Sequence, residues 1–179
     1  MIRPIVGLAL AALLIVPATT TAQTGEALIK KLGASNPVSN PGFPADPTAE
    51  YKIAWNVTAG PKEPGELVDG FRRPANFLFM SDAEGLSRAR VHLAIIVYGA
   101  ATQSLLRNVA YKAATGKDNG SLPLLEALHE AGVKIIVCGQ AIAGRKISRD
   151  ELLPFVQVAT SATMARATLH AQGYATFGQ

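Results

Sequence analysis

Three features of the sequence predict an α/β domain in which helices cover both faces of a mainly parallel β-sheet. Residues 90–99 and 133–138 form short, nearly continuous apolar runs, as strands buried on both faces do. Segments with apolar residues at helical spacing lie between and after these runs. Glycines end several of those segments. Such alternation is typical of βαβ units, whose strands are parallel.

The N-terminal residues have the pattern of an export signal. Arg3 precedes an apolar run over residues 5–16, and Thr20 and Ala22 fit a small-x-small cleavage site. Residues 1–22 are therefore predicted to be a signal peptide that is removed near Ala22, and the protein is expected in the periplasm. An uncleaved membrane anchor is the alternative, although the run is shorter than the roughly twenty residues that span a bilayer.

Residues 23–50 are predicted to form a proline-rich N-terminal arm or linker. The prolines between residues 37 and 47 disfavour regular structure there. Only GEALIKKL, at 25–32, has the pattern of a helical turn or two. Residues 51–179 then have the length and pattern of one packed domain.

The domain is predicted to begin with a strand and a helix. Residues 51–58, YKIAWNVT, are apolar and β-branched enough to lie inside a sheet. Apolar residues from Leu67 to Met80 predict a helix, which Pro74 interrupts or restarts.

Two further helices are predicted around the middle of the chain. After the strand at 90–99, residues 102–116 have helical spacing, with Thr102 as the N-cap and Val109 on the apolar face. Residues 121–132 repeat the pattern, with Ser121 as a cap and a glycine at the end. The strand at 133–138 follows directly.

The C-terminal part supplies the last predicted elements. Ser148 and Glu151 have the spacing of a capping box. A fourth strand is predicted over 154–160, a helix over 161–172 and a short last strand over 174–177.

Cys138 is the only cysteine, and it ends the strand at 133–138 where a glycine-containing loop, GQAIAG, is expected. One cysteine cannot form an intramolecular disulfide, so in an exported protein it is buried and inert, reactive, or paired between molecules. Ligand crevices of parallel sheets lie at the carboxyl ends of the strands. Cys138 therefore lies at that edge, and Tyr98 and Gly99 share it if their strand runs parallel.

A reactive Cys138 requires groups that favour the thiolate, which is the nucleophilic form. Peptide N–H groups of the strand-to-helix connection carry partial positive charge, and Gly139 allows the backbone to approach the sulfur. Arg145 or Lys146 adds charge if the connection folds back. The alternative, a small buried residue that only completes the strand, remains open.

Other function classes find little support. The formal net charge is +4 at pH 7, and the basic residues are scattered without interleaved aromatic residues, so no nucleic-acid partner is expected. His92, His129 and His170 are far apart in sequence and show no metal-ligand spacing, so no metal is expected. No cofactor-binding motif appears, and no membrane association is expected after signal cleavage.

From Tyr51 to its end the chain resembles exported members of the DsrE/DsrF family of sulfur-relay proteins. The resemblance rests on an ordered set of segments: YKIAWNVT, RVHLAIIVYGAAT, LLEALHEAGVKIIVCGQAIAGRKIS, ELLPFVQVATSAT and LHAQGYA. It implies a three-layer α/β/α sandwich with a parallel sheet of about five strands, and a homotrimer or homohexamer. Members carry sulfur as a persulfide between a donor and an acceptor protein.

The resemblance also implies the site. Cys138 matches the family's cysteine, and Tyr98, Gly99, Gly139 and Gln140 are the candidate pocket around it. Many relatives have His-Gly where this chain has Tyr98-Gly99. Two hypotheses follow: a periplasmic sulfur carrier or sulfurtransferase-like protein with its persulfide on Cys138, or a non-catalytic oligomeric or ligand-binding module in which the cysteine is structural. A thiol-redox role is a third possibility.

Overall fold

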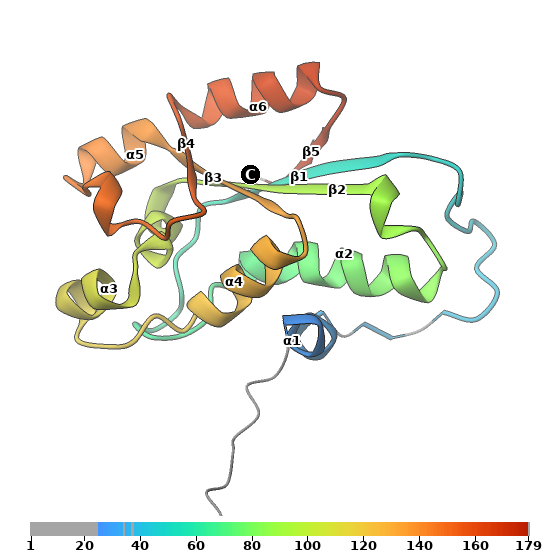
Figure 1. Ribbon diagram of the computed structural model, residues 1–179, viewed down its shortest axis with the longest axis horizontal. Coiled ribbons are helices and arrows are strands. Elements are labelled where there is room, and N and C mark those ends of the chain that lie inside the picture. The colour runs from blue at the N-terminus through green and yellow to red at the C-terminus, as the bar shows by residue number, and fades with distance from the viewer. Residues whose placement is uncertain (1–24, 34, 37, 179) are drawn as a thin grey trace, which may run out of the picture.

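The computed structural model describes residues 25–33, 35–36 and 38–178 (Figure 1). The predicted signal peptide lies outside these residues. No helix in the described part is both long and apolar enough to cross a membrane.

The centre of the fold is a five-stranded sheet with the strand order β4-β3-β2-β1-β5. Every pair of neighbouring strands is parallel, which confirms the predicted α/β class. The strands are β1 (Tyr51–Val57), β2 (Val91–Val97), β3 (Lys134–Cys138), β4 (Gln157–Ala159) and β5 (Ala175–Phe177). The middle strands β2 and β3 are buried along most of their length, as their apolar runs predict.

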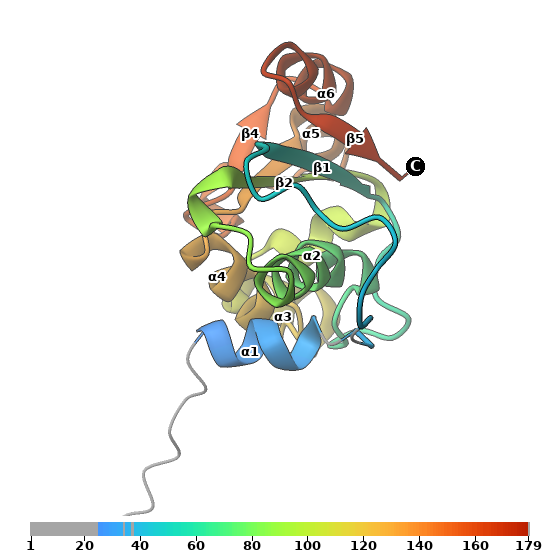
Figure 2. The same cartoon turned by 90° about the vertical axis from the view of Figure 1, so that its right-hand side faces the viewer.

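Helices lie on both faces of the sheet, which gives the predicted three layers (Figures 1 and 2). They are α1 (Gly25–Leu32), α2 (Arg72–Ala83), α3 (Asn108–Thr115), α4 (Leu122–Glu130), α5 (Gly139–Gly144) and α6 (Ala162–Ala171). Figure 2 shows α1, α2 and α4 on one side of the sheet and α6 on the other. We call the side that carries α6 the α6 face.

The two faces have cores of different size. The larger core lies on the side of α2 and α4 and includes the fully buried Phe71 and Leu125. The smaller one lies under α6 and consists mostly of small or medium side chains: Ala54, Ala94, Ile96, Ile136, Cys138, Ala162, Ala165, Leu169 and Tyr174. The only cysteine is thus a member of the α6-face core.

The predicted helix over 102–116 is wrong at its start. Residues Gly99–Leu105 form a 3-10 helix, and α3 begins only at Asn108. The break arises because the chain pairs here with a distant segment: the Arg107 N–H donates to the Glu151 carbonyl at 2.8 Å, and the Leu153 N–H donates to the Leu105 carbonyl at 2.9 Å. These bonds hold the backbone extended between the two helices.

Two side chains of that region differ accordingly from prediction. Thr102 is not an N-cap but lies inside the 3-10 helix, fully buried. Val109, expected on the buried face, is 84% exposed. The shifted helix start turns Val109 toward solvent.

Three smaller differences concern element ends. The expected loop after Cys138 is a helix, because α5 begins at Gly139. The strand predicted over 154–160 is confined to β4. Ser121 does not cap α4 through its side chain; its hydroxyl instead accepts a 3.1 Å hydrogen bond from the Val68 N–H.

Other local predictions are confirmed. A short 3-10 turn at Asp69–Phe71 precedes α2, which restarts the helical path at Arg72 and has Pro74 as its third residue. A proline in the first turn needs no N–H. The Ser148–Glu151 capping box is present.

Helix α1, within the segment predicted as an arm, packs on the domain. Its Ile29 is 1% exposed, and α1 contacts α2 and α4. Arg88 links α1 to α2 through charged contacts. It donates two 2.6 Å hydrogen bonds to the Asp82 carboxylate of α2 and lies 3.5 Å from Glu26 of α1. The hydrogen bonds from Arg88 hold the pKa of Asp82 below its ordinary value.

An Asp82→Asn variant should therefore show a pH-dependent loss of stability. A carboxyl whose pKa is lowered by folding stabilises the protein above its unfolded pKa, which is near 3.8, and this contribution disappears as pH falls through the folded pKa. At neutral pH the variant should lose up to about 1 kcal/mol, because the pair is partly exposed. Denaturant unfolding from pH 7 down to pH 2.5 should show the two proteins converging in acid.

Asp69→Asn is the matched control. Its carboxylate is 72% exposed and lies 3.6 Å from Arg72, so its replacement should change stability little at any pH. An Asp82→Asn deficit that stays constant into acid would contradict the assignment of this ion pair.

Candidate functional site

Three side chains stand in one row at the carboxyl end of the sheet. Val97 pairs with Val137, and Cys138 pairs with Ala159. Tyr98 directly follows β2, so it comes level with Cys138. Because side chains alternate along a strand, Tyr98, Cys138 and Ala159 all belong to the α6 face, where they pack together. We call these three residues the edge row.

Cys138 is the last residue of β3 and the residue before α5. It is 7% exposed and packs among the small side chains of Ala159, Ala162 and Ala165. Small neighbours leave more space around a sulfur atom than branched ones would, although access from solvent is narrow.

The predicted contribution of Arg145 and Lys146 to Cys138 is not observed. Both follow the six residues of α5, and α5 separates them from Cys138 at its start. The Arg145 guanidinium donates to the Ala141 carbonyl at 3.3 Å. The Arg145 guanidinium thus bonds to the backbone of α5.

Two glycines allow close backbone approach at this edge. Gly99 has φ +62°, and a Cβ there would lie 2.8 Å from the Thr58 carbonyl oxygen. At Gly139 a Cβ would lie 2.7 Å from the Ala159 carbonyl oxygen. Both positions of the candidate pocket therefore require glycine, since backbone atoms cannot easily move aside.

The Gln140 side chain links α5 to the residue that follows β4 by a hydrogen bond. Its side-chain amide donates to the Thr160 carbonyl at 3.3 Å. Gly139 also approaches Thr160, at 3.1 Å from its carbonyl oxygen to a Cβ built on Gly139. The predicted site residues thus lie at the ends of β2 and β3, and the contacts with Ala159 and Thr160 at the end of β4 fix the connection that follows Cys138.

Arg166 of α6 was missed by the sequence analysis. Its guanidinium donates to the Tyr98 hydroxyl at 3.3 Å and lies 5.9 Å from the centre of the Tyr98 ring, as in a cation–π contact. The available signal was helical spacing: Arg166 lies four residues after the buried Ala162 and so shares its side of α6. Arg166 thus brings positive charge to the edge row.

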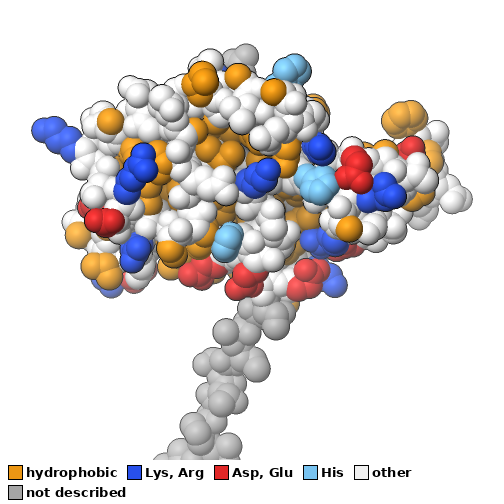
Figure 3. All heavy atoms as spheres, turned by 45° about the horizontal axis from the view of Figure 1, so that its top comes forward, with side chains coloured by type: hydrophobic (Ala, Val, Ile, Leu, Met, Phe, Trp, Pro, Cys, Tyr) orange, Lys and Arg blue, Asp and Glu red, His pale blue; other side chains and the backbone are white. Residues whose placement is uncertain are grey.

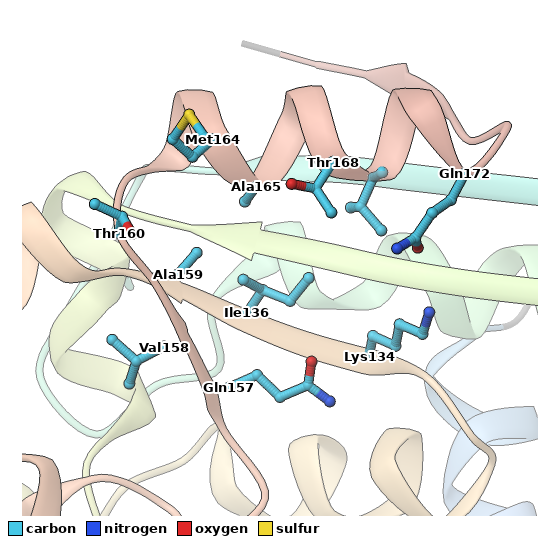
Figure 4. Close-up of a pocket in the computed structure, with 11 residues that line it drawn as sticks. Lys134, Ile136, Gln157, Val158, Ala159, Thr160, Met164, Ala165, Thr168 and Gln172 are labelled. Atoms are coloured by element: carbon cyan, nitrogen blue, oxygen red, sulfur yellow. The ribbon is translucent and has the colours of Figure 1, made fainter.

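A groove of about 400 Å³ lies between α6 and the strands β3 and β4. Its wall includes Ile136, Ala159, Ala165 and Leu169, all of which also pack in the core that contains Cys138. Figure 3 shows apolar side chains gathered in a hollow on this side, with basic side chains near its margins. Figure 4 shows the groove itself. Cys138 does not line the groove itself, but it packs in the same core as these four wall residues.

No group of three or more His, Cys, Asp and Glu side chains that could hold a metal occurs among the described residues. His92 instead contacts the Glu50 carboxylate at 2.8 Å, and His129 stacks on Phe155 with ring centres 4.5 Å apart. These histidines have local structural contacts.

Comparisons with known proteins agree with the fold. No curated protein matches the sequence. The crystal structure of the ychN protein from E. coli is similar, with a TM-score of 0.50 and 23% identity over 71% of this chain and 99% of that one. The structure of the protein of unknown function MTH1491 from Methanobacterium thermoautotrophicum has a TM-score of 0.45 and 15% identity, over 72% of this chain and 98% of that one.

At 23% identity the ychN structure shows the fold alone. The family comparison goes further, because residues 70–177, more than half of the chain, match one family of known sequence pattern. The matched region contains the whole edge row, including Cys138. The chain belongs to the DsrE/DsrF-like family.

Proposed function

We propose that this protein is a periplasmic sulfur carrier that holds sulfane sulfur as a persulfide on Cys138. The family, whose members generally act in sulfur relay, supports the proposal. The observation that carries it is the position of the chain's only cysteine at the carboxyl end of β3, beside Tyr98 in the edge row. Carboxyl ends of parallel strands are where such sheets place their ligand sites.

The loading step is an exchange between sulfur atoms. The Cys138 thiolate attacks the outer sulfur of a donor persulfide, R–S–SH, and a new S–S bond forms while the donor's S–S bond breaks. The donor leaves as the thiolate R–S⁻, which takes up the proton released when Cys138 ionised. The outer sulfur keeps its oxidation state, so the exchange needs no external oxidant or reductant.

The burial of Cys138 restricts which donors fit. With 7% exposure, the sulfur can be reached only by a slender group, such as the terminal –SH of a persulfide. Loading should therefore be selective for sulfane sulfur over bulky alkylating reagents.

Intact-mass measurement of the purified protein after treatment with inorganic polysulfide tests the proposal. We expect a gain of one sulfur atom per chain that a reducing thiol removes, and no gain in Cys138→Ser. No added mass on the native protein would overturn the proposal.

Arg166 should raise the loading rate by favouring negative charge near the edge row. Replacing it by glutamine should slow loading by about threefold, because a partly exposed charge at this range contributes under about 1 kcal/mol. The rate is measured by quenching the polysulfide reaction at intervals and weighing the protein.

Arg149→Gln, at an exposed arginine next to the Ser148 cap, is the matched control and should load at the native rate. If the Arg166→Gln protein loaded as fast as the control, Arg166 would have no role in the loading of Cys138.

A second candidate function is a ligand-binding or assembly module in which Cys138 only packs, and the burial of Cys138 favours it. In that case Cys138→Ala should cost about 1–2 kcal/mol of stability and leave every other property intact, and the native protein should accept no sulfur.

Export and self-association belong to the same proposal. Fractionation of cells that express the full chain should find the protein in the periplasm, shortened by residues 1–22. Sedimentation equilibrium should give a homotrimer or homohexamer. A full-length cytoplasmic protein, or a monomer at all concentrations, would contradict these two parts while leaving the chemistry of Cys138 to its own test.

A further inference from the structure

We propose that the groove beside α6 binds a small organic acid that carries a thiol, and that the persulfide of this thiol is the donor for Cys138. This inference rests on the proposed function and names its substrate class. The donor would place its anionic group at Lys134, its apolar chain along Ile136, and its sulfur toward Cys138.

Strand β3 supports this order of groups, because Lys134 and Ile136 line the groove, and Cys138, which does not line it, packs in the same core as Ala159 at its end. Lys134, Ile136 and Cys138 alternate along β3 and therefore point to the same face of the sheet. Ile136 and Cys138 belong to the α6-face core, and the intervening Ile135 and Val137 to the opposite one. A cationic and a thiol-bearing residue thus lie at the two ends of one strand. Their Cα atoms are about 13 Å apart, because each residue rises about 3.3 Å.

The Lys134 end has the chemistry of an anion site. The Lys134 ammonium lies 5.2 Å from the centre of the Tyr174 ring, and no carboxylate in the described part of the chain forms a salt bridge with it. Figure 4 shows Lys134 and Gln172 at one end of the groove, with the Gln157 amide directed to the same side. An ammonium and two amides can donate hydrogen bonds to one carboxylate.

The middle of the groove suits an apolar chain. Ile136, Ala165 and Leu169 line it, and Ala159 at the far end belongs to the edge row. Figure 4 shows Ala159, Thr160 and Met164 at this far end, away from Lys134. The volume of about 400 Å³ lies in the range of small-molecule sites.

The exchange is the loading step described for Cys138, and the group R of the donor R–S–SH is now the carbon chain that carries the acid. The Cys138 sulfur forms a bond to the outer sulfur of the bound persulfide, the donor's S–S bond breaks, and the thiol acid leaves as a thiolate that takes up one proton. No oxidant or reductant is needed.

Binding can be tested apart from sulfur transfer. Octanoate is the probe, octanol is its uncharged analogue, and calorimetry on the Cys138→Ser protein measures both. We expect octanoate to bind and octanol to bind about tenfold more weakly. Lys134→Gln should abolish this preference. Thr168→Trp, at an exposed α6 position that lines the groove, should block both probes.

Lys31→Gln, on the exposed surface of α1 in the opposite layer, is the matched control and should bind octanoate like the parent protein. Circular dichroism confirms that each variant is folded. Absence of octanoate binding, or equal binding of both probes, would overturn the proposal.

Transfer supplies the second test. The persulfide of 8-mercaptooctanoate should load Cys138 about tenfold faster than that of 8-mercaptooctanol at low concentration, and Lys134→Gln should remove the difference. Equal rates for the two donors would overturn the proposed substrate class and leave the carrier function standing. Octanoate binding without loading by any donor, polysulfide included, would instead overturn the carrier function and, with it, the donor role of the bound acid.

Discussion

Replacing Gly139 by alanine should destabilise the protein by about 1–3 kcal/mol, as overpacking of a close-packed site does. The new methyl group would lie 2.7 Å from the Ala159 carbonyl oxygen and 3.1 Å from that of Thr160. Both atoms are backbone, so β3 and β4 would have to separate where they end. Sulfur loading of Cys138 should fall as well, since the neighbouring strand end would shift. Thermal unfolding and polysulfide loading measure the two effects.

Gly144→Ala provides a control within the same helix. Gly144 is the last residue of α5, and a Cβ there would meet no atom within 4 Å. Alanine should therefore be neutral or should stabilise the protein by up to about 1 kcal/mol, because glycine is the poorer helix former. If the Gly139→Ala protein were as stable as the Gly144→Ala protein, this would contradict the close approach of Gly139 to the backbone at the end of β4.

Replacing Cys138 by serine should abolish sulfur acceptance while the fold persists. The hydroxyl cannot form a persulfide, and its oxygen is nearly isosteric with the sulfur. Burying a hydroxyl in an apolar site should lower the free energy of unfolding by about 1–2 kcal/mol. Urea unfolding measures the stability, and intact mass after polysulfide treatment measures the acceptance.

Cys138→Ala separates the two effects, because it also lacks the thiol but buries no polar group. Both variants should fail to load and should retain cooperative unfolding. A serine or alanine variant that still gained sulfur would show that another part of the chain, or tightly associated sulfur, accounts for the added mass.

The parallel sheet could be predicted because its strands carry local signals. The run at 90–99 contains the whole of β2, and the run at 133–138 contains the whole of β3 with Cys138 at its end. Burial on both faces makes such strands apolar throughout, and this pattern needs no knowledge of the rest of the fold. The position of Cys138 at the carboxyl edge followed from the same signal.

The errors arise where distant segments meet. The helix predicted from Thr102 is interrupted because residues 105–107 bond to residues 151–153, a pairing that periodicity cannot reveal. The strand predicted over 154–160 is longer than β4, because only Gln157–Ala159 pair with β3. The Ser121 hydroxyl accepts a hydrogen bond from the Val68 N–H instead of capping its own helix. Local propensity is weaker than such tertiary contacts.

The candidate site shows the same limit. Cys138, Gly99 and Gly139 could be identified because residue type alone marks them. Arg166 could not, because its role depends on how α6 lies over Tyr98. The sequence did not identify Lys134 as a candidate either, because its place at one end of the groove depends on how α6 packs over β3 and β4.

The most direct test of the account follows radiolabelled sulfane sulfur through the native protein. The protein is loaded with labelled polysulfide, separated from free label by gel filtration, and then treated with a reducing thiol. We expect one labelled sulfur per chain, located on the proteolytic peptide that contains Cys138, and its complete release by the thiol. Label that is absent, lies on other peptides, or resists the thiol would contradict a persulfide on Cys138.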